Sequence, residues 1–165
     1  MIGIVNSSPL IYLGKIGLVH LLRDLFDSII TTRSVMNEVL DATTPEFTIL
    51  TDAFESWLKM SSVRVSPLSE KLSMMGLHQG EIDVISLGYE MKETESIVII
   101  DDLAARDIAR TLGLDLTGTI GILLRAVKTN ILSKNNAIAK FNYLIEGTSF
   151  RISTKYYLQI LEQLS

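Results

Sequence analysis

Residues 96–102 carry the stretch Ser-Ile-Val-Ile-Ile-Asp-Asp, which decides the fold of this chain. The apolar, β-branched run Ile97–Ile100 is typical of a strand that is buried on both faces, as in a parallel sheet. Asp101 and Asp102 follow where this strand ends. A helix is predicted from Leu103 to Leu112, with Gly113 in the position of a C-terminal cap. The stretch therefore predicts a strand, an acidic turn and a helix.

The same alternation recurs along the chain. Further strands are predicted at Ile2–Val5, Ser28–Thr32, Ser62–Ser66 and Leu114–Thr117. Between and after them, helices are predicted at Leu10–Ile16, Leu18–Phe26, Arg33–Ala42, Phe47–Met60, Gln79–Glu93, Ile120–Thr129, Ala137–Ile145 and Lys155–Leu164. Strands that alternate with helices favour an α/β fold with a central parallel sheet covered on both faces. Ligands of such folds bind beyond the C-terminal ends of the strands, so those ends are where a site is expected.

Length and composition narrow the class of protein. A chain of 165 residues fits a single domain, 1–165, in which residues 132–165 form a C-terminal helical extension. The chain has no cysteine, which excludes disulfides, thiolate metal sites and cysteine nucleophiles. Its net charge of −4 argues against a broad basic surface for nucleic acid, so any such role must rely on a local site.

The cellular location is also an expectation at this point. Mean hydropathy is positive at +0.32, yet no apolar run approaches the roughly 20 residues that a membrane-spanning helix needs. The N-terminus, Met1–Val5, is short and lacks a positive leader, so no export signal is predicted. We expect a cytoplasmic protein without a membrane role.

Polar side chains stand at the ends of the two most apolar strands. Asn6 follows Val5, and Asp101 and Asp102 follow Ile100. One interpretation is that the two aspartates cap the next helix, which aspartate does well. A single cap needs only one aspartate, however, so the alternative is that a carboxylate faces the crevice as part of a site.

Glu81 occupies an unusual position on its predicted helix. At about 100° per residue it falls in the middle of an apolar arc made by Ile82, Val84, Ile85, Leu87, Gly88 and Met91. A carboxylate that points toward a core is costly unless it is paired or bound to a cation. The alternative is a favourable interaction with the helix dipole. Glu38 lies only at the border of an apolar arc and, taken alone, is best interpreted as a surface glutamate.

Other candidate residues carry weaker signals. Thr117-Gly118-Thr119 comes directly before a predicted helix, where hydroxyls and amides either bind phosphate or cap the helix. Neither GxxxxGK nor GxGxxG occurs in the chain, so nucleotide-fuelled chemistry is unsupported. His20 and His78 lack a second histidine at ligand spacing and are interpreted as structural. The apolar stripe that begins at Tyr156 is interpreted as core or as a subunit contact.

An ordered set of motifs resembles one known family. The set comprises Asn6-Ser7-Ser8-Pro9-Leu10-Ile11, Val35–Glu38, His78–Glu81, Val98–Asp102 with Arg106, and Thr117–Gly121. It is similar to the PIN-domain family, and most similar to a branch of uncharacterised prokaryotic PIN proteins. The resemblance covers the chain to about Leu132, and it is the order of the motifs that is specific, because each one alone is weak.

The resemblance implies a three-layer α/β/α fold with strand order 3-2-1-4-5 and an acidic pocket that holds Mg²⁺ or Mn²⁺. Family members are typically ribonucleases, often the toxin of a type II toxin–antitoxin pair, which implies an RNA substrate and an antitoxin partner, with a homodimer as a further expectation. The implied catalytic residues are Asn6, Glu38, Glu81, Asp101 and Asp102, of which Asn6, Glu81, Asp101 and Asp102 are the implied metal ligands. The implied substrate contacts are Ser7, Arg106, Thr117 and Thr119.

Asn6 departs from the aspartate that is usual in the wider family. Asparagine keeps an oxygen acceptor but removes one negative charge, which weakens metal binding and water activation. The alternative function is therefore a weakly active or inactive module that binds nucleic acid or a partner. A haloacid-dehalogenase fold requires an Asp-x-Asp motif after its first strand, but this chain has Asn6-Ser7-Ser8 there. A receiver fold requires a phosphoacceptor aspartate and a later lysine at a strand end, and neither has a convincing counterpart in this sequence.

Overall fold

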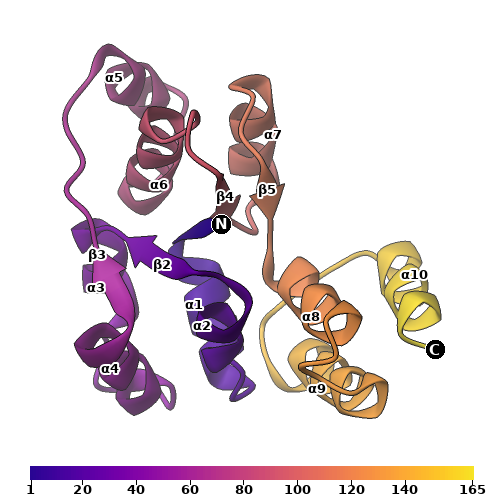
Figure 1. Cartoon of the computed structure of the whole chain (residues 1–165). Coiled ribbons are helices and arrows are strands. Elements are labelled where there is room, and N and C mark those ends of the chain that lie inside the picture. The colour runs from indigo at the N-terminus through magenta and orange to yellow at the C-terminus, as the bar shows by residue number, and fades with distance from the viewer.

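A computed structural model describes all 165 residues, and a five-stranded parallel sheet lies at its centre (Figure 1). The strands are β1 (Ile2–Val5), β2 (Ser28–Thr31), β3 (Leu58–Met60), β4 (Ser96–Ile99) and β5 (Leu116–Thr117). Their order across the sheet is β3-β2-β1-β4-β5, and every neighbouring pair is parallel. This order confirms the predicted 3-2-1-4-5 arrangement and the α/β class.

Ten helices surround the sheet and complete a three-layer α/β/α fold (Figure 1). Their bounds are α1 (Ser7–Lys15), α2 (His20–Leu25), α3 (Arg33–Val39), α4 (Phe47–Ser56), α5 (Pro67–Met74), α6 (Gln79–Glu90), α7 (Leu103–Thr111), α8 (Thr119–Lys128), α9 (Lys134–Gly147) and α10 (Thr154–Leu164). None of them combines the length and the apolar character that crossing a bilayer requires.

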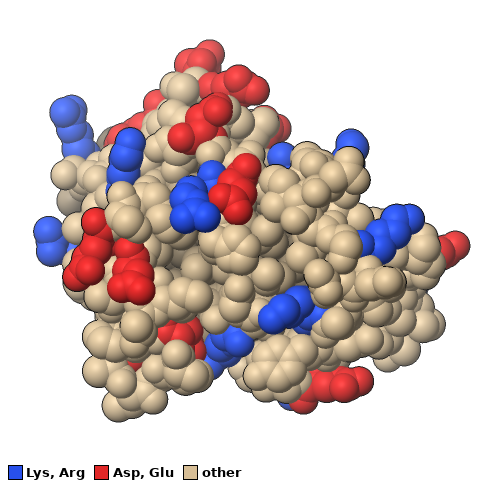
Figure 2. Space-filling model, turned by 60° about the horizontal axis from the view of Figure 1, so that its bottom comes forward, with Lys and Arg blue, Asp and Glu red and all other residues tan.

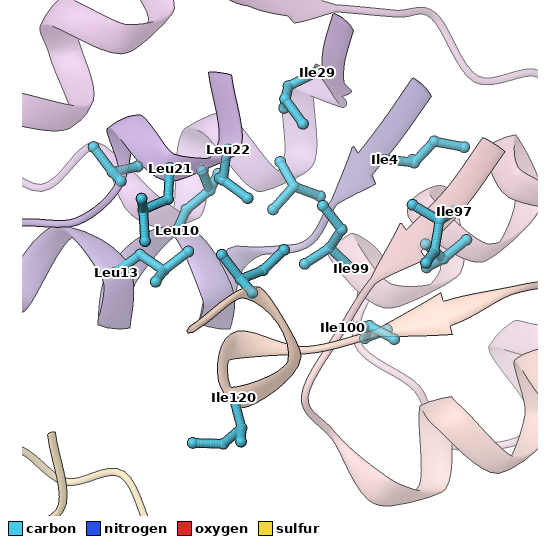
Figure 3. Close-up of a cluster of buried hydrophobic side chains, with 14 of the residues drawn as sticks. Ile4, Leu10, Leu13, Leu21, Leu22, Ile29, Ile97, Ile99, Ile100 and Ile120 are labelled. Carbon is cyan, nitrogen blue, oxygen red and sulfur yellow. The ribbon is translucent and has the colours of Figure 1, made fainter. Parts of the chain in front are cut away.

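The two faces of the sheet are covered by different helices. On one face, Gly88 of α6 approaches so closely that a Cβ there would stand 2.6 Å from Val98 Cγ2 and 3.9 Å from Ile4 Cδ1. The opposite face carries the apolar side chains of Ile29 and Ile99, which gather with leucines of α1 and α2 (Figure 3). Because side chains alternate between the faces of a strand, both faces are apolar, as a doubly covered parallel sheet requires.

The carboxyl ends of the parallel strands meet at one edge. Asn6 follows β1, Thr32 follows β2 and Asp101 follows β4 by two residues. Helices begin directly after these ends: α1 at Ser7, α3 at Arg33 and α7 at Leu103. Polar side chains from distant parts of the sequence therefore come together at this edge.

The segment between α3 and α6 differs from the prediction. A helix over 47–60 and a strand over 62–66 were expected, but α4 ends at Ser56 and the third strand is Leu58–Met60, paired with β2. The prediction of a strand over residues 62–66 is therefore wrong. Three residues at the edge of a sheet carry little periodicity of their own, and the pairing with β2 decides their conformation.

One helix was missed by the prediction, and another begins earlier than predicted. Helix α5 was not predicted, although Ser66 and Ser69 form a reciprocal capping box with Pro67 as the first helical residue, a recognisable helix start. Helix α9 begins at Lys134, with Ser133 as its N-cap. Side chains of α9 and α10 belong to the same apolar core as the sheet. The interpretation of residues 132–165 as an extension of a single domain stays a prediction.

Candidate active site

A pocket of about 310 Å³ lies at the carboxyl edge of the sheet, and it gathers most of the predicted site residues. Helices α1 and α6 contribute to its wall mainly from their N-terminal halves, α3 contributes Glu38 from its last turn, and α7 contributes its N-cap Asp102. We call it the acidic pocket. It is lined by Asn6, Ser7, Ser8, Tyr12, Glu38, His78, Glu81, Asp101, Asp102, Phe150 and Arg151. All five predicted catalytic residues are in this set.

Asn6 stands at the floor of the acidic pocket, directly after β1. Its backbone N–H donates to the Ile99 carbonyl at 2.9 Å, which fixes the strand end, and its side chain is only 5% exposed. Its Oδ1 is buried and accepts no hydrogen bond from any protein group. A buried carbonyl oxygen without a donor is unfavourable by about 1–3 kcal/mol, so this oxygen is a ready acceptor for a bound group.

Glu38 reaches the pocket from α3. The hydroxyl of Ser7 donates to Glu38 Oε2 at 2.7 Å and thereby links the start of α1 to α3. A Cβ at Gly80 would stand 3.3 Å from Glu38 Oε2 and 3.4 Å from Asn6 Oδ1. The two oxygens therefore face the same small space beside the first turn of α6, which a larger residue than glycine would restrict.

Glu81 enters the pocket from the first turn of α6, as its place on the apolar arc predicts. It is 9% exposed, and the backbone N–H of His78 donates to its Oε2 at 3.0 Å. Burial raises the pKa of Glu81 above its ordinary value, the His78 hydrogen bond opposes the rise, and the negative charges of Asp102 and Glu38 add to it. The carboxylate is thus held in a site that favours either a proton or a cation.

Asp101 and Asp102 have separate roles. Asp102 caps α7, because its Oδ1 accepts the Ala105 N–H at 2.9 Å. Asp101 instead accepts hydrogen bonds from Ser8 Oγ at 2.8 Å and from the N–H and hydroxyl of Thr119 at 2.8 and 2.7 Å. The cap interpretation therefore holds for Asp102, while both aspartates line the pocket and their role in a site stays a prediction.

The predicted substrate contacts are spread over two places. Ser7 lines the acidic pocket. Arg106 and Thr117 instead line a second, neighbouring cleft, and Thr119 is fully buried behind Asp101. The Thr117 side chain packs against α8 so closely that a Cβ at Gly121 would stand 2.1 Å from its Oγ1. The start of α8 thus supports Asp101 and borders the second cleft.

Several residues of the acidic pocket were not predicted. His78 was interpreted as structural, yet it lines the pocket beside Glu81. Tyr12 and Phe150 pack edge to face, with ring centroids 5.0 Å apart, and bring the segment after α9 over the pocket together with Arg151. This segment is more than 140 residues away from β1 in sequence, and no local pattern indicated that it returns to the sheet edge.

The oxygen atoms that face the pocket fit a hard divalent cation as ligands. Asn6 Oδ1 accepts no hydrogen bond, and the carboxylates of Glu38 and Glu81 line the same pocket. Oxygen ligands of this kind are those that Mg²⁺ and Mn²⁺ prefer. No three acidic or histidine side chains converge in a ready ligand group, however. The set therefore suits an ion bound through one or two carboxylates and an amide oxygen rather than a closed cage of carboxylates.

Comparisons with known proteins identify the family. The sequence profile of a family described as a PIN domain matches residues 2–165, almost the whole chain. The chain belongs to the PIN-domain family. A solved structure of a PilT N-terminus domain protein from the hyperthermophilic archaeon Sulfolobus solfataricus P2 is similar, with 15% sequence identity over 78% of this chain and 95% of that chain and a TM-score of 0.48. No curated protein sequence matches the chain.

PIN domains are generally nucleases that bind nucleic acid. The surface charge of this chain is therefore relevant to the binding of a polyanion. Figure 2 shows one face of the molecule, on which Lys and Arg side chains are scattered among Asp and Glu side chains over a largely uncharged surface, some of them side by side. No continuous basic surface is seen there. With a net charge of −4, any binding of a polyanion by this chain would depend on local positive groups.

Proposed function

We propose that this PIN domain is a divalent-metal-dependent ribonuclease whose active site is the acidic pocket. The observation that carries the proposal is the buried Asn6 Oδ1, which has no hydrogen-bond donor and faces the space beside Glu38 and Glu81. The raised pKa of Glu81 supports it, because perturbed carboxylates cluster at functional sites. Mg²⁺ and Mn²⁺ are the proposed cofactors.

The side chains have distinct proposed roles. Asn6 Oδ1, Glu38 and Glu81 would hold the ion, with Asp102 beside them, and Asp101 positions the start of α8 and the Ser8 hydroxyl. When bound, the ion supplies positive charge to a phosphate and lowers the pKa of water. Glu38 or Glu81 would accept the proton of a water that attacks phosphorus, while the ester P–O bond opposite would break and its oxygen would leave with a proton from solvent.

RNA cleavage tests this proposal. Purified protein with Mn²⁺ is expected to cut a labelled single-stranded RNA, and Glu81→Gln is expected to lower the rate by about a hundredfold or more. Glu90→Gln is the matched control, because Glu90 lies exposed on the same helix and outside the acidic pocket. The proposal is overturned if wild type does not cut RNA, or if Glu81→Gln cuts as fast as Glu90→Gln.

A second function is favoured by the number of carboxylates in the acidic pocket that already accept hydrogen bonds from the protein itself. Asp101 accepts three hydrogen bonds, Asp102 caps α7, and Glu38 and Glu81 each accept one. Together with the neutral Asn6, this arrangement supports a module that binds nucleic acid or a partner with little activity. Metal-dependent cleavage that appears only in Asn6→Asp, and not in wild type, is the result that selects this function.

The proposal extends to the biological role of this nuclease as the toxin of a toxin–antitoxin pair. The PIN resemblance alone supports a toxin that is inhibited by an antitoxin, and the homodimer and the cytoplasmic location likewise stay predictions. A toxin is expected to arrest growth when expressed, and Glu81→Gln is expected to relieve the arrest. Co-expression of an antitoxin, if a small protein is encoded beside this chain, is expected to do the same, and growth unaffected by wild type would contradict the toxin role.

A further inference from the structure

A second hollow adjoins the acidic pocket. It has a volume of about 600 Å³ and is bordered by α7, by the turn between β5 and α8, and by the segment that joins α9 to α10. We call it the arginine cleft, because Arg106, Arg110 and Arg151 line it. Asp101, Phe150 and Arg151 line both hollows, so the arginine cleft and the acidic pocket are adjacent.

Arg106 is fixed in place without a carboxylate partner. Its Nη1 donates to the carbonyl oxygen of Ile100 at 2.8 Å, and no Asp or Glu oxygen lies within ion-pair distance of its guanidinium. A Cβ at Gly118 would stand 3.0 Å from Arg106 Nη1, so the guanidinium packs directly against the turn before α8. Its remaining N–H groups form no ion pair, so they can donate to a bound group in the cleft.

Arg151 is arranged in the same way at the junction of the two hollows. Its Nη1 donates to the carbonyl oxygens of Thr148 and Phe150, both at 2.8 Å, which holds the arginine at the end of α9. It too has no carboxylate within ion-pair distance. Arg110 differs, since it pairs with Asp107 at 2.9 Å on the exposed side of α7. Arg106 and Arg151 are therefore the two available cations of the cleft.

The rest of the cleft offers flat and apolar surface. Tyr156 lines it with a side chain that is 40% exposed, and Leu103 lines it at 77% exposed. Exposed aromatic rings beside arginines bind unpaired bases by stacking, whereas a duplex hides the faces of its bases. Fixed guanidinium groups next to a tyrosine thus match a single strand better than a double helix.

We propose that the arginine cleft binds the strand on one side of the cleaved bond. Arg151 binds the phosphate nearest the acidic pocket, Arg106 binds the next one along, and Tyr156 stacks with a base between or beyond them. The inference rests on the proposed function in one respect only, because it takes the acidic pocket as the place of cleavage. Binding in the arginine cleft itself needs no ion.

Binding of a labelled single-stranded RNA of about ten nucleotides in EDTA tests the cleft apart from catalysis. Arg106→Gln and Arg151→Gln are each expected to weaken binding roughly tenfold, and to reduce the slope of log K against log salt by about 0.7. Arg23→Gln is the matched control, because it removes the same charge from an exposed position on α2, and it is expected to bind as wild type. Circular dichroism and thermal unfolding confirm that each variant is folded.

Tyrosine substitutions test the stacking surface. Tyr156→Ala is expected to weaken binding at least fivefold, because it removes the ring on which a base would stack, while Tyr156→Phe keeps the ring and the affinity. A blunt duplex of the same sequence is expected to bind more weakly than the single strand, and single-stranded DNA is expected to bind through the same residues. Equal affinity for duplex and single strand overturns the role of Tyr156.

The outcomes test RNA binding by the arginine cleft separately from RNA cleavage in the acidic pocket. If folded Arg106→Gln and Arg151→Gln bind RNA as tightly as Arg23→Gln, with unchanged salt dependence, the arginine cleft is not the binding site, whether or not the protein cuts RNA. If they lose affinity while wild type with Mn²⁺ cuts nothing, the cleft stands and the nuclease proposal fails.

Discussion

The backbone N–H and the hydroxyl of Thr119 both donate to the carboxylate of Asp101, at 2.8 and 2.7 Å. Asp101 accepts a third hydrogen bond from Ser8 Oγ. One carboxylate at the end of β4 therefore ties together the N-terminal turns of α1 and α8. Each turn carries residues that border the acidic pocket or the arginine cleft, so Asp101 sets their spacing.

The first prediction concerns Asp101. Asp101→Asn is expected to lower the free energy of unfolding by roughly 2–3 kcal/mol, because an amide accepts charge-assisted hydrogen bonds less well and points an N–H₂ at a donor. Asp102→Asn is the matched control and is expected to be nearly neutral, since asparagine caps a helix as well as aspartate does. Urea unfolding measures both, and equal stability of the two variants would contradict the anchoring role.

The second prediction compares two glycines that border different carboxylates of the acidic pocket, Gly118 beside Asp101 and Gly80 beside Glu38. A Cβ at Gly118 would stand 2.7 Å from Asp101 Oδ1 and 3.2 Å from the Ile100 carbonyl oxygen, whereas at Gly80 its nearest atom would be at 3.3 Å. Gly118→Ala is therefore expected to destabilise the fold by about 1–3 kcal/mol. Gly80→Ala is expected to fold with little loss but to weaken Mn²⁺ binding, because its methyl group narrows the space between Asn6 and Glu38. Thermal unfolding with and without Mn²⁺ distinguishes the two effects.

The third prediction is a dependence of stability on pH. Burial raises the pKa of Glu81 in the folded protein, so its contribution to stability is fully present below its ordinary pKa and is lost as the pH rises through the folded value. Glu81→Gln is expected to be more stable than wild type at about pH 8, and the difference is expected to shrink at about pH 5. Urea unfolding at both values, with Glu90→Gln as the control, checks this. A difference that does not change with pH would contradict it.

Asn6→Asp gives the fourth prediction. Without metal, a new carboxylate at a 5% exposed position beside Glu38 and Glu81 is expected to lower Tm. With Mn²⁺, the same variant is expected to gain more in Tm than wild type, because a charged oxygen replaces a neutral ligand. Asn135→Asp, exposed on α9, is expected to show neither effect. An Asn6→Asp variant that gains no more from Mn²⁺ than wild type would argue against an ion at this position.

The sequence alone predicts much of this architecture. Most of the buried strands and the polar residues at their ends are recognisable because parallel strands are continuous apolar runs with abrupt ends, whereas the strand order was implied by the resemblance to the PIN-domain family. Glu81 is recognisable because a carboxylate interrupts an apolar helix face. These signals are local and depend on periodicity, which a single sequence displays.

Long-range contacts are the part that the sequence conceals. The contact of Asp101 with Thr119 crosses a whole helix and a strand, and nothing near Asp101 distinguishes it from its neighbour Asp102, which is the cap. Arg151 reaches the acidic pocket only because α9 packs against α8 and returns the chain to the sheet edge. Leu58–Met60 forms a strand because β2 offers an edge to pair with.

The most direct test of the central claim is diffraction from crystals soaked in Mn²⁺, with data collected for anomalous scattering from manganese. An anomalous peak is expected in the acidic pocket, bounded by Asn6 Oδ1 and by the carboxylates of Glu38 and Glu81, and it is expected to be absent in Glu81→Gln. A crystal that takes up Mn²⁺ elsewhere, or not at all, while these side chains keep their present hydrogen bonds would contradict the assignment of the acidic pocket as a metal-dependent active site.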